Sequence, residues 1–192
     1  IQQAKVTAQG LDNIYTQDLQ LLTPKATNYL TIILRRIEEG ALWPKCTIQA
    51  KASFLSKNPA KLHDTLEYRV LAIQSVIYRR WASCRLNDLS PWIKNYQLEE
   101  IYAGMPGVGA EDAWYLTSLE MELAHCKGEE MVGAATDIMK CFDQIVRPLL
   151  YILLQIIGLP EGILQAYILY QESLIFRNNL ATGIGKQHIR PF

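Results

Sequence analysis

Asp137 and the residues around it are the strongest candidates for chemistry in this chain. A run of small and apolar residues from Met131 leads to this carboxylate, and such a run predicts a buried strand over 131–138. A buried carboxylate is costly unless a cation compensates its charge. A divalent cation such as Mg²⁺ or Mn²⁺ is the obvious candidate, because these ions prefer oxygen ligands, and Asp137 and the backbone carbonyl of Ile138 are the candidate ligands. The alternative is that Asp137 caps a helix that begins near Phe142.

The order Asp137-Ile-Met-Lys-Cys-Phe142-Asp143 resembles the first catalytic motif of reverse transcriptases, of the group II intron and non-LTR retrotransposon kind. The resemblance implies nucleotidyl transfer by a two-metal mechanism, with Asp137 as a catalytic metal ligand. It also implies that Phe142 packs beneath the incoming sugar and excludes a 2′-hydroxyl. RNA-copying RNA polymerases more often carry an acid at the position of Phe142, so that family is disfavoured. Simple core packing of Phe142 is compatible with the same sequence.

Further segments match the same family in the expected order. Gln9 to Ile14 resembles a Gly-x-Asp-Gly element, with Asn13 in place of the second glycine; asparagine tolerates a positive φ, so the turn should be kept. Phe54–Lys57 and Glu67–Leu71 resemble the two strands of the fingers, with Val70 where the family has proline. The resemblance implies that Lys57 and Arg69 bind the triphosphate of the incoming nucleotide, a role that suits a point charge and a planar guanidinium. A solvated surface position is the alternative for each cation.

The glycine-rich stretch from Gly104 to Ala113 resembles the loop and helix start of the family that approach the template strand. Gly104 and Gly107 would let the backbone come close to the nucleic acid. The family's Phe and Ser/Thr are replaced here by Met105 and Ala110. Beyond this loop, residues 149–192 match the palm helices and the approach to the next motif.

The resemblance implies an α+β fold, with right-hand polymerase fingers plus a partial palm that is truncated before the remaining catalytic motifs. Residues 1–192 would be a partial reverse transcriptase domain, with fingers and fingers-palm over about 1–126 and the first palm portion over about 127–192. The implied partners are an RNA template, a DNA primer, dNTP and the remainder of the polymerase. No Asp-Asp pair occurs in the sequence, so the chain alone should be catalytically silent and should expose apolar surface near the run 149–159. The alternative is a decayed or co-opted relative that binds RNA or protein without catalysis.

The elements that must position these residues alternate between helices and strands. A short helix or turn is expected over 12–20, and Thr23 is expected to cap a helix that runs to about Glu39. The sequence predicts further helices over 75–89, from about Glu111 to Cys126, over 145–157 and over 161–173, and strands over 48–54, 68–73, 131–138, 174–178 and 187–190. Ser90-Pro91 is expected to end the helix before it.

The bulk composition is that of an ordinary globular protein, with 49% hydrophobic residues and a formal net charge of zero. The charge is nevertheless segregated: residues 51–94 carry eight Lys/Arg against three Asp/Glu, and residues 95–130 carry one Lys against eight acids. A basic segment of this kind can neutralise phosphates. Four cysteines scattered singly, without a signal peptide or an apolar run long enough for a bilayer, predict an intracellular protein without membrane contact. The resemblance to retroelement enzymes implies the nucleus or an organelle.

Overall fold

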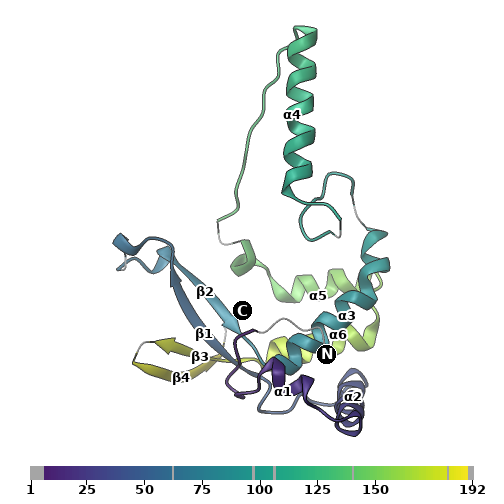
Figure 1. The fold of residues 1–192 in the computed structure, drawn as a ribbon, viewed down its shortest axis with the longest axis vertical. Helices are drawn as coiled ribbons and strands as arrows, with labels where there is room; N and C mark the ends of the chain where they lie inside the picture. Colours follow the sequence, from purple (N-terminus) through teal and green to yellow (C-terminus); the bar gives the residue numbers. More distant parts are fainter. Residues whose placement is uncertain are drawn as a thin grey trace. The chain divides into compact units, whose positions relative to one another are not determined.

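A computed structural model describes residues 7–61, 63–96, 98–105, 107–139, 141–180 and 182–189. In this part the chain is α+β, as predicted, with six α-helices and one four-stranded mixed sheet (Figure 1). It forms two compact units, residues 1–85 with 145–192 and residues 86–144. The first unit contains the whole sheet, so it carries the scaffold of the fold.

Two helices open the first unit. The short α1 (Thr16–Gln20) precedes α2 (Pro24–Glu38), which begins as predicted: the hydroxyl of Thr23 accepts a hydrogen bond from the backbone N–H of Ala26 at 3.3 Å. Proline occupies the first helical position, where no N–H is needed. The helix ends before Gly40, whose φ of 100° is accessible mainly to glycine.

The sheet has the order β2-β1-β3-β4. Strands β1 (Gln49–Ser56) and β2 (Tyr68–Ile73) pair antiparallel, β1 and β3 (Ile175–Leu180) pair parallel, and β3 and β4 (Gly183–Ile189) form an antiparallel hairpin. Short 3₁₀ turns at Pro59–Lys61 and Thr65–Glu67 connect β1 to β2. The predicted hairpin is confirmed, but β4 begins at 183 rather than 187 and the turn is correspondingly tighter; Arg190 lies outside the described residues.

Two helices lead into the hairpin. The predicted break at Gly158-Leu-Pro160 separates α5 (Arg147–Ile156) from α6 (Glu161–Ser173), and Gly158 has a φ of 83°. Helix α6 passes close to α2 at Gly162: a Cβ placed on this residue would lie only 2.9 Å from the carbonyl oxygen of Glu38. Helix α5 has no buried residue, and the apolar surface expected near 149–159 is present on it: Leu149, Ile152, Leu153 and Ile156 are exposed.

Aromatic rings form the centre of the core. Trp43 lies edge-on to Tyr78, Trp81 and Tyr170 at centroid distances of 5.2–5.5 Å. Tyr78 is stacked on Tyr170 at 3.4 Å. The aliphatic members of the core pack around them: Ile37, Ala50, Ala166 and Leu174. The indole N–H of Trp43 donates to the carbonyl of Ala166 at 2.9 Å, so the core joins residues that are far apart in sequence.

The prediction that Ser90-Pro91 ends a helix is wrong, because helix α3 spans Val76–Lys94 and contains both residues. The helix continues through Pro91 for one further turn. Proline removes one backbone donor, and the loss is small here because only three helical residues follow it. The hydroxyl of Ser90 donates to the carbonyl of Leu86 at 3.3 Å, a bond within the helix from one residue to the fourth before it.

The second unit contains α4 (Ala110–Lys127) and the segment that follows it. The predicted start and end of this helix are confirmed: the Asp112 carboxylate accepts from the N–H of Gly109 at 2.7 Å, and Gly128 follows the helix with a φ of 67°. The predicted strand over 131–138 is wrong, because this stretch has no strand structure and every residue in it is exposed. A strand needs a neighbouring strand for its backbone hydrogen bonds, and the described sheet contains only β1 to β4.

Candidate functional site

One face of the sheet carries cations and the opposite face carries the core. Ala50 and Ala52 of β1 are buried, and side chains alternate along a strand, so Lys51 lies on the other face. Arg177 of β3 is opposite Lys51, and Arg69 of β2 is opposite Leu55, which shares the face of Lys51. The hydrogen bond from Asn179 to Ser53, at 3.3 Å, lies on this same face.

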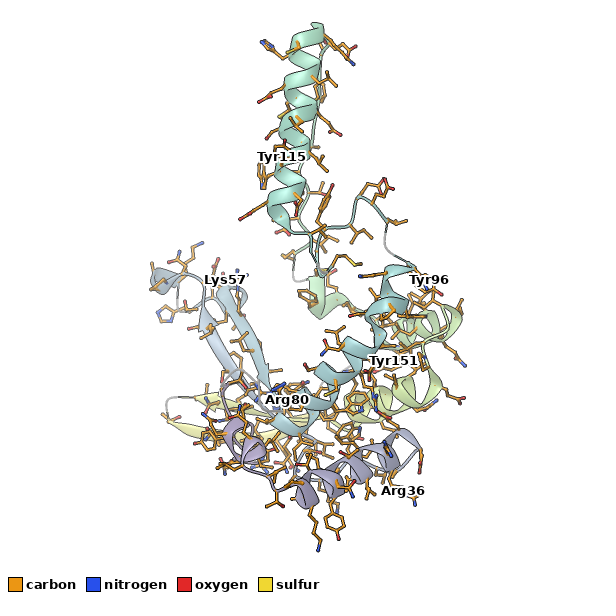
Figure 2. All side chains as sticks on the ribbon, turned by 45° about the vertical axis from the view of Figure 1, so that its right-hand side comes forward. Arg36, Lys57, Arg80, Tyr96, Tyr115 and Tyr151 are labelled. Carbon is orange, nitrogen blue, oxygen red and sulfur yellow. The ribbon has the colours of Figure 1, made fainter. Side chains whose placement is uncertain are left out.

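Lys57 and Arg69, the predicted triphosphate ligands, belong to this cationic face. The backbone N–H of Lys57 donates to the carbonyl of Glu67 at 2.7 Å, so Lys57 lies opposite Glu67 and diagonal to Arg69. Diagonal neighbours of this kind are about 7–8 Å apart, within reach of one phosphate chain. Both residues are exposed near the end of the β1–β2 hairpin, where Figure 2 labels Lys57. The structure therefore brings these two candidates together.

Lys51 and Arg177 stand directly opposite each other in the parallel register. Like charges in this arrangement destabilise a sheet unless an anion lies between them. Neither makes an ion pair with a described residue, and the Nε of Arg177 is buried without a hydrogen-bond partner in the described part of the chain. Glu67, which lies opposite Lys57 at the end of the β1–β2 hairpin, is engaged by Lys61 at 3.7 Å. The face is therefore suited to an anionic ligand with several charges. Sequence reasoning missed this pair, because the register of β1 against β3 is a long-range property.

Asp137 lies in the second unit, in a segment without regular structure. Its side chain is exposed, as are those of Ile138 and Phe142, the last being 84% exposed in the 3₁₀ turn Cys141–Gln144. The premise that the carboxylate is buried is therefore wrong for this structure. Lys140 and the side chain of Asp143 lie outside the described residues.

The same segment offers oxygen atoms that could bind a metal ion. Asp137 and the carbonyl of Ile138 provide oxygen, the donor that Mg²⁺ prefers. Among the described residues, no three His, Cys, Asp or Glu side chains gather closely enough to hold a metal ion. One carboxylate with a carbonyl fits a Mg²⁺ whose other positions are filled by water and phosphate oxygens. It does not by itself complete a two-metal site.

The glycine loop precedes α4 in the same unit as Asp137. Gly104 and Gly107 have φ values of 75° and 87°, and, their chain neighbours apart, no atom of the described residues lies within 4 Å of a Cβ placed on either. The positive φ explains why glycine occupies both positions. The open space leaves the backbone accessible, which the predicted template contact requires. Pro106 lies outside the described residues.

The turn at the start of the chain forms as the sequence predicts. Asn13 has a φ of 56°, and its N–H donates to the carbonyl of Gly10 at 3.4 Å. A Cβ at Gly10 would lie 3.1 Å from the backbone of Ser75, so the turn packs tightly against the start of α3. Arg79 of this helix donates to the carbonyl of Ala8 at 2.5 Å, and burial lowers the pKa of its guanidinium while nearby Asp12 opposes that shift. The turn thus ties residues 7–13 to α3.

Lys57 and Arg69 belong to the first unit, whereas Gly104, Gly107, Asp137, Ile138 and Phe142 belong to the second. No family model matches the chain, and no curated protein matches its sequence. In the part that the structure describes, no helix is both long enough and apolar enough to cross a bilayer.

Proposed function

We propose that the chain is the fingers and first palm portion of an RNA-directed DNA polymerase, of the group II intron or non-LTR retrotransposon kind. In this proposal it works with the remainder of the palm and the thumb to add dNTPs to a primer on an RNA template. The observation that carries the proposal is the cationic face of the sheet. Lys57 and Arg69, chosen from the sequence as triphosphate ligands, lie as diagonal neighbours on that face.

The arrangement of charge supports a polyanionic ligand rather than a solvated surface. Lys51 and Arg177 extend the face toward the centre of the sheet, and none of these four cations has an ion-pair partner among the described residues. Charged side chains on a solvated surface contribute little to the stability of the protein, whatever their arrangement. A row of like charges that the register forces together is stabilised when phosphates occupy it.

In the second unit, Asp137 and the Ile138 carbonyl would hold Mg²⁺ or Mn²⁺. The bound metal would activate the attacking hydroxyl and neutralise the triphosphate. Phe142 would limit the space beneath the sugar, which favours deoxynucleotides. The exposed position of these three residues leaves them accessible to substrate and to the remaining carboxylates of the polymerase.

Steady-state kinetics of the polymerase that contains this chain test the role of Arg69. Replacing Arg69 with Ala should raise the apparent KM for dNTP about tenfold or more, because a hydrogen bond to a charged phosphate contributes roughly 1.5–3 kcal/mol. Arg69→Lys should recover part of the loss, since the charge remains and the planar fork does not. Lys25→Ala is the matched control, because Lys25 is an exposed cation at the start of α2, and the KM for dNTP should not change in this variant. An unchanged KM in Arg69→Ala would reject the role.

The alternative, a co-opted module that binds RNA without chemistry, predicts a different result in the same experiment. It predicts RNA binding that depends on the cationic face, with no primer extension by the full gene product at any Mg²⁺ or Mn²⁺ concentration.

A further inference from the structure

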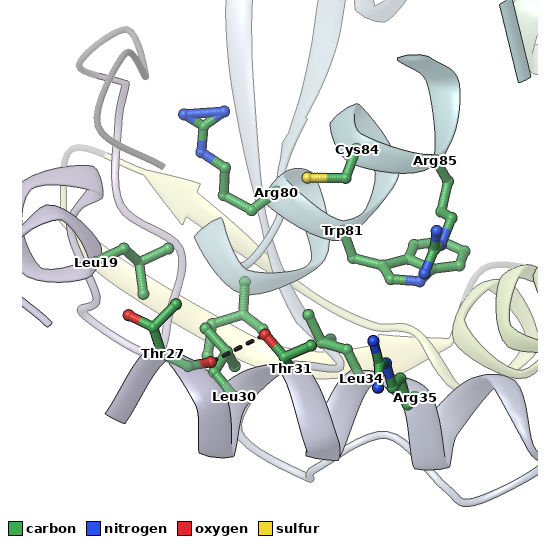
Figure 3. Close-up of a pocket in the computed structure, with 11 residues that line it drawn as sticks. Leu19, Thr27, Leu30, Thr31, Leu34, Arg35, Arg80, Trp81, Cys84 and Arg85 are labelled. Atoms are coloured by element: carbon green, nitrogen blue, oxygen red, sulfur yellow. Dashed lines mark hydrogen bonds between the residues drawn. The ribbon is translucent and has the colours of Figure 1, made fainter. Parts of the chain in front are cut away.

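A groove lies between α2 and α3, and none of the residues that line it has a role in the proposed polymerase function. Helix α2 contributes Thr27, Leu30, Thr31, Leu34 and Arg35, and helix α3 contributes Ile77, Arg80, Trp81, Cys84 and Arg85 (Figure 3). Both sets follow the spacing i, i+3, i+4, i+7, i+8, so each helix presents one continuous stripe to the groove. Leu19 of α1 completes the lining, which encloses about 230 Å³.

The floor of the groove is apolar. Leu19, Leu30, Leu34, Ile77 and Trp81 supply most of it. The hydroxyl of Thr31 donates to the carbonyl of Thr27 at 3.0 Å, so this polar group is already satisfied within α2. An occupant must therefore offer apolar groups to the floor.

The rim of the groove is cationic. Arg35, Arg80 and Arg85 line it, and among the described residues no Asp or Glu does. Arg85 is held by Glu38 through a bidentate pair at 2.5 and 3.0 Å, which leaves the charges of Arg35 and Arg80 uncompensated by any described residue. The rim is thus complementary to acidic side chains.

We infer that this groove docks an acidic amphipathic helix of a partner protein. The lined part of α2 spans eight residue steps, about 12 Å at 1.5 Å per residue, which matches two turns of a partner helix. Such a helix inserts apolar residues spaced i, i+3, i+4 and i+7 into the floor, while its flanking carboxylates pair with Arg35 and Arg80. The enclosed volume is below the roughly 300–1,000 Å³ of pockets that take whole small ligands, and it suits a few side chains.

Nucleic acid fits this groove less well. Base recognition by proteins of low sequence specificity uses an exposed aromatic face. Trp81, the one aromatic residue that lines the groove in the described part of the chain, is 4% exposed. It packs against Trp43 and Tyr78 and donates its N–H to Glu38 at 2.6 Å. Leucine and isoleucine side chains offer nothing to a phosphate.

Fluorescence anisotropy with labelled 15-residue peptides tests the inference on the 192-residue chain. The probe has Leu at i, i+3, i+4 and i+7 with Glu on both flanks. One control peptide carries Lys in place of Glu, and a second has the same composition with its leucines scattered around the helix. The acidic probe should bind at least tenfold more tightly than either control, and its affinity should fall with salt.

Variants of the protein locate the binding. The double variant Arg35→Glu/Arg80→Glu should weaken the probe about tenfold, and Thr31→Trp should abolish binding because the indole fills the groove. Lys25→Glu adds negative charge to α2 outside the groove and should change affinity less than twofold. If circular dichroism shows that Thr31→Trp is unfolded, the charge-reversal variant and the control peptides still test the inference.

Equal affinity for the three peptides, or equal loss in Lys25→Glu and the double variant, would overturn the inference. So would displacement of the probe by a 15-nucleotide single-stranded RNA whose own binding is lost in the double variant, since the groove would then bind nucleic acid.

Discussion

Replacing Trp43 tests the aromatic core on which the sheet and its helices depend. Trp43 is 5% exposed, contacts three rings and donates to the carbonyl of Ala166. Trp43→Phe removes that hydrogen bond, worth about 1 kcal/mol, and weakens ring contacts worth roughly 0.5–1.5 kcal/mol each, so unfolding should become easier by about 2 kcal/mol. Trp43→Ala should lose about 3–5 kcal/mol, a large part of the roughly 5–15 kcal/mol that stabilises a domain.

Urea denaturation followed by far-UV circular dichroism measures these differences. The midpoint should move to lower urea in the order wild type, Phe, Ala, without a change in slope. Tyr29→Ala is the control, because Tyr29 is 57% exposed on α2 and its loss should stay within about 0.5 kcal/mol. If Trp43→Ala costs no more than Tyr29→Ala, the core described above is wrong.

Two further predictions concern packing and pH. Gly162→Ala should destabilise the protein by about 1–2 kcal/mol, because the added Cβ would meet the Glu38 carbonyl at 2.9 Å. The higher helix propensity of alanine offsets only part of this overpacking. Thermal melts measure the difference, with Gln165→Ala as a control at an exposed position of the same helix. Burial raises the pKa of Tyr78 to about 12 against the opposing effect of its hydrogen bond from Gln171. The unfolded chain, with a tyrosine pKa of about 10, therefore loses its proton first, and stability should fall between pH 10 and 12 by up to ~1.4 kcal/mol per pH unit. Tyr78→Phe should make this fall shallower in urea titrations, and an unchanged slope would show that Tyr78 does not contribute to it.

Local signals in the sequence predicted much of the fold. Thr23 with Pro24 and Gly40 define α2, the alternation around Ala50 and Ala52 predicts β1, and Gly128 and Gly158 mark helix ends. Each of these features depends on residues within one or two turns of one another. That is the range in which capping, backbone φ and side-chain alternation act.

Features set by distant partners were not predictable in the same way. The small-residue run that ends at Asp137 has the composition of a buried strand, but it has no strand neighbour in the described sheet and Val132 is 95% exposed. The pairing of Lys51 with Arg177 depends on the register of two strands whose paired residues lie 126 positions apart in the sequence, which hydrophobic patterning does not determine. The groove between α2 and α3 likewise needs two helix faces to be placed together.

Primer extension on an RNA template by the full gene product, with and without Asp137→Asn, tests the polymerase proposal most directly. Asparagine keeps the shape of the side chain and removes the charge that would hold the metal. Mutating a residue that hydrogen-bonds a metal ligand typically lowers activity about 10–100-fold. Loss of the metal ligand itself should therefore lower kcat by at least about a hundredfold. Equal extension by both proteins would contradict the account.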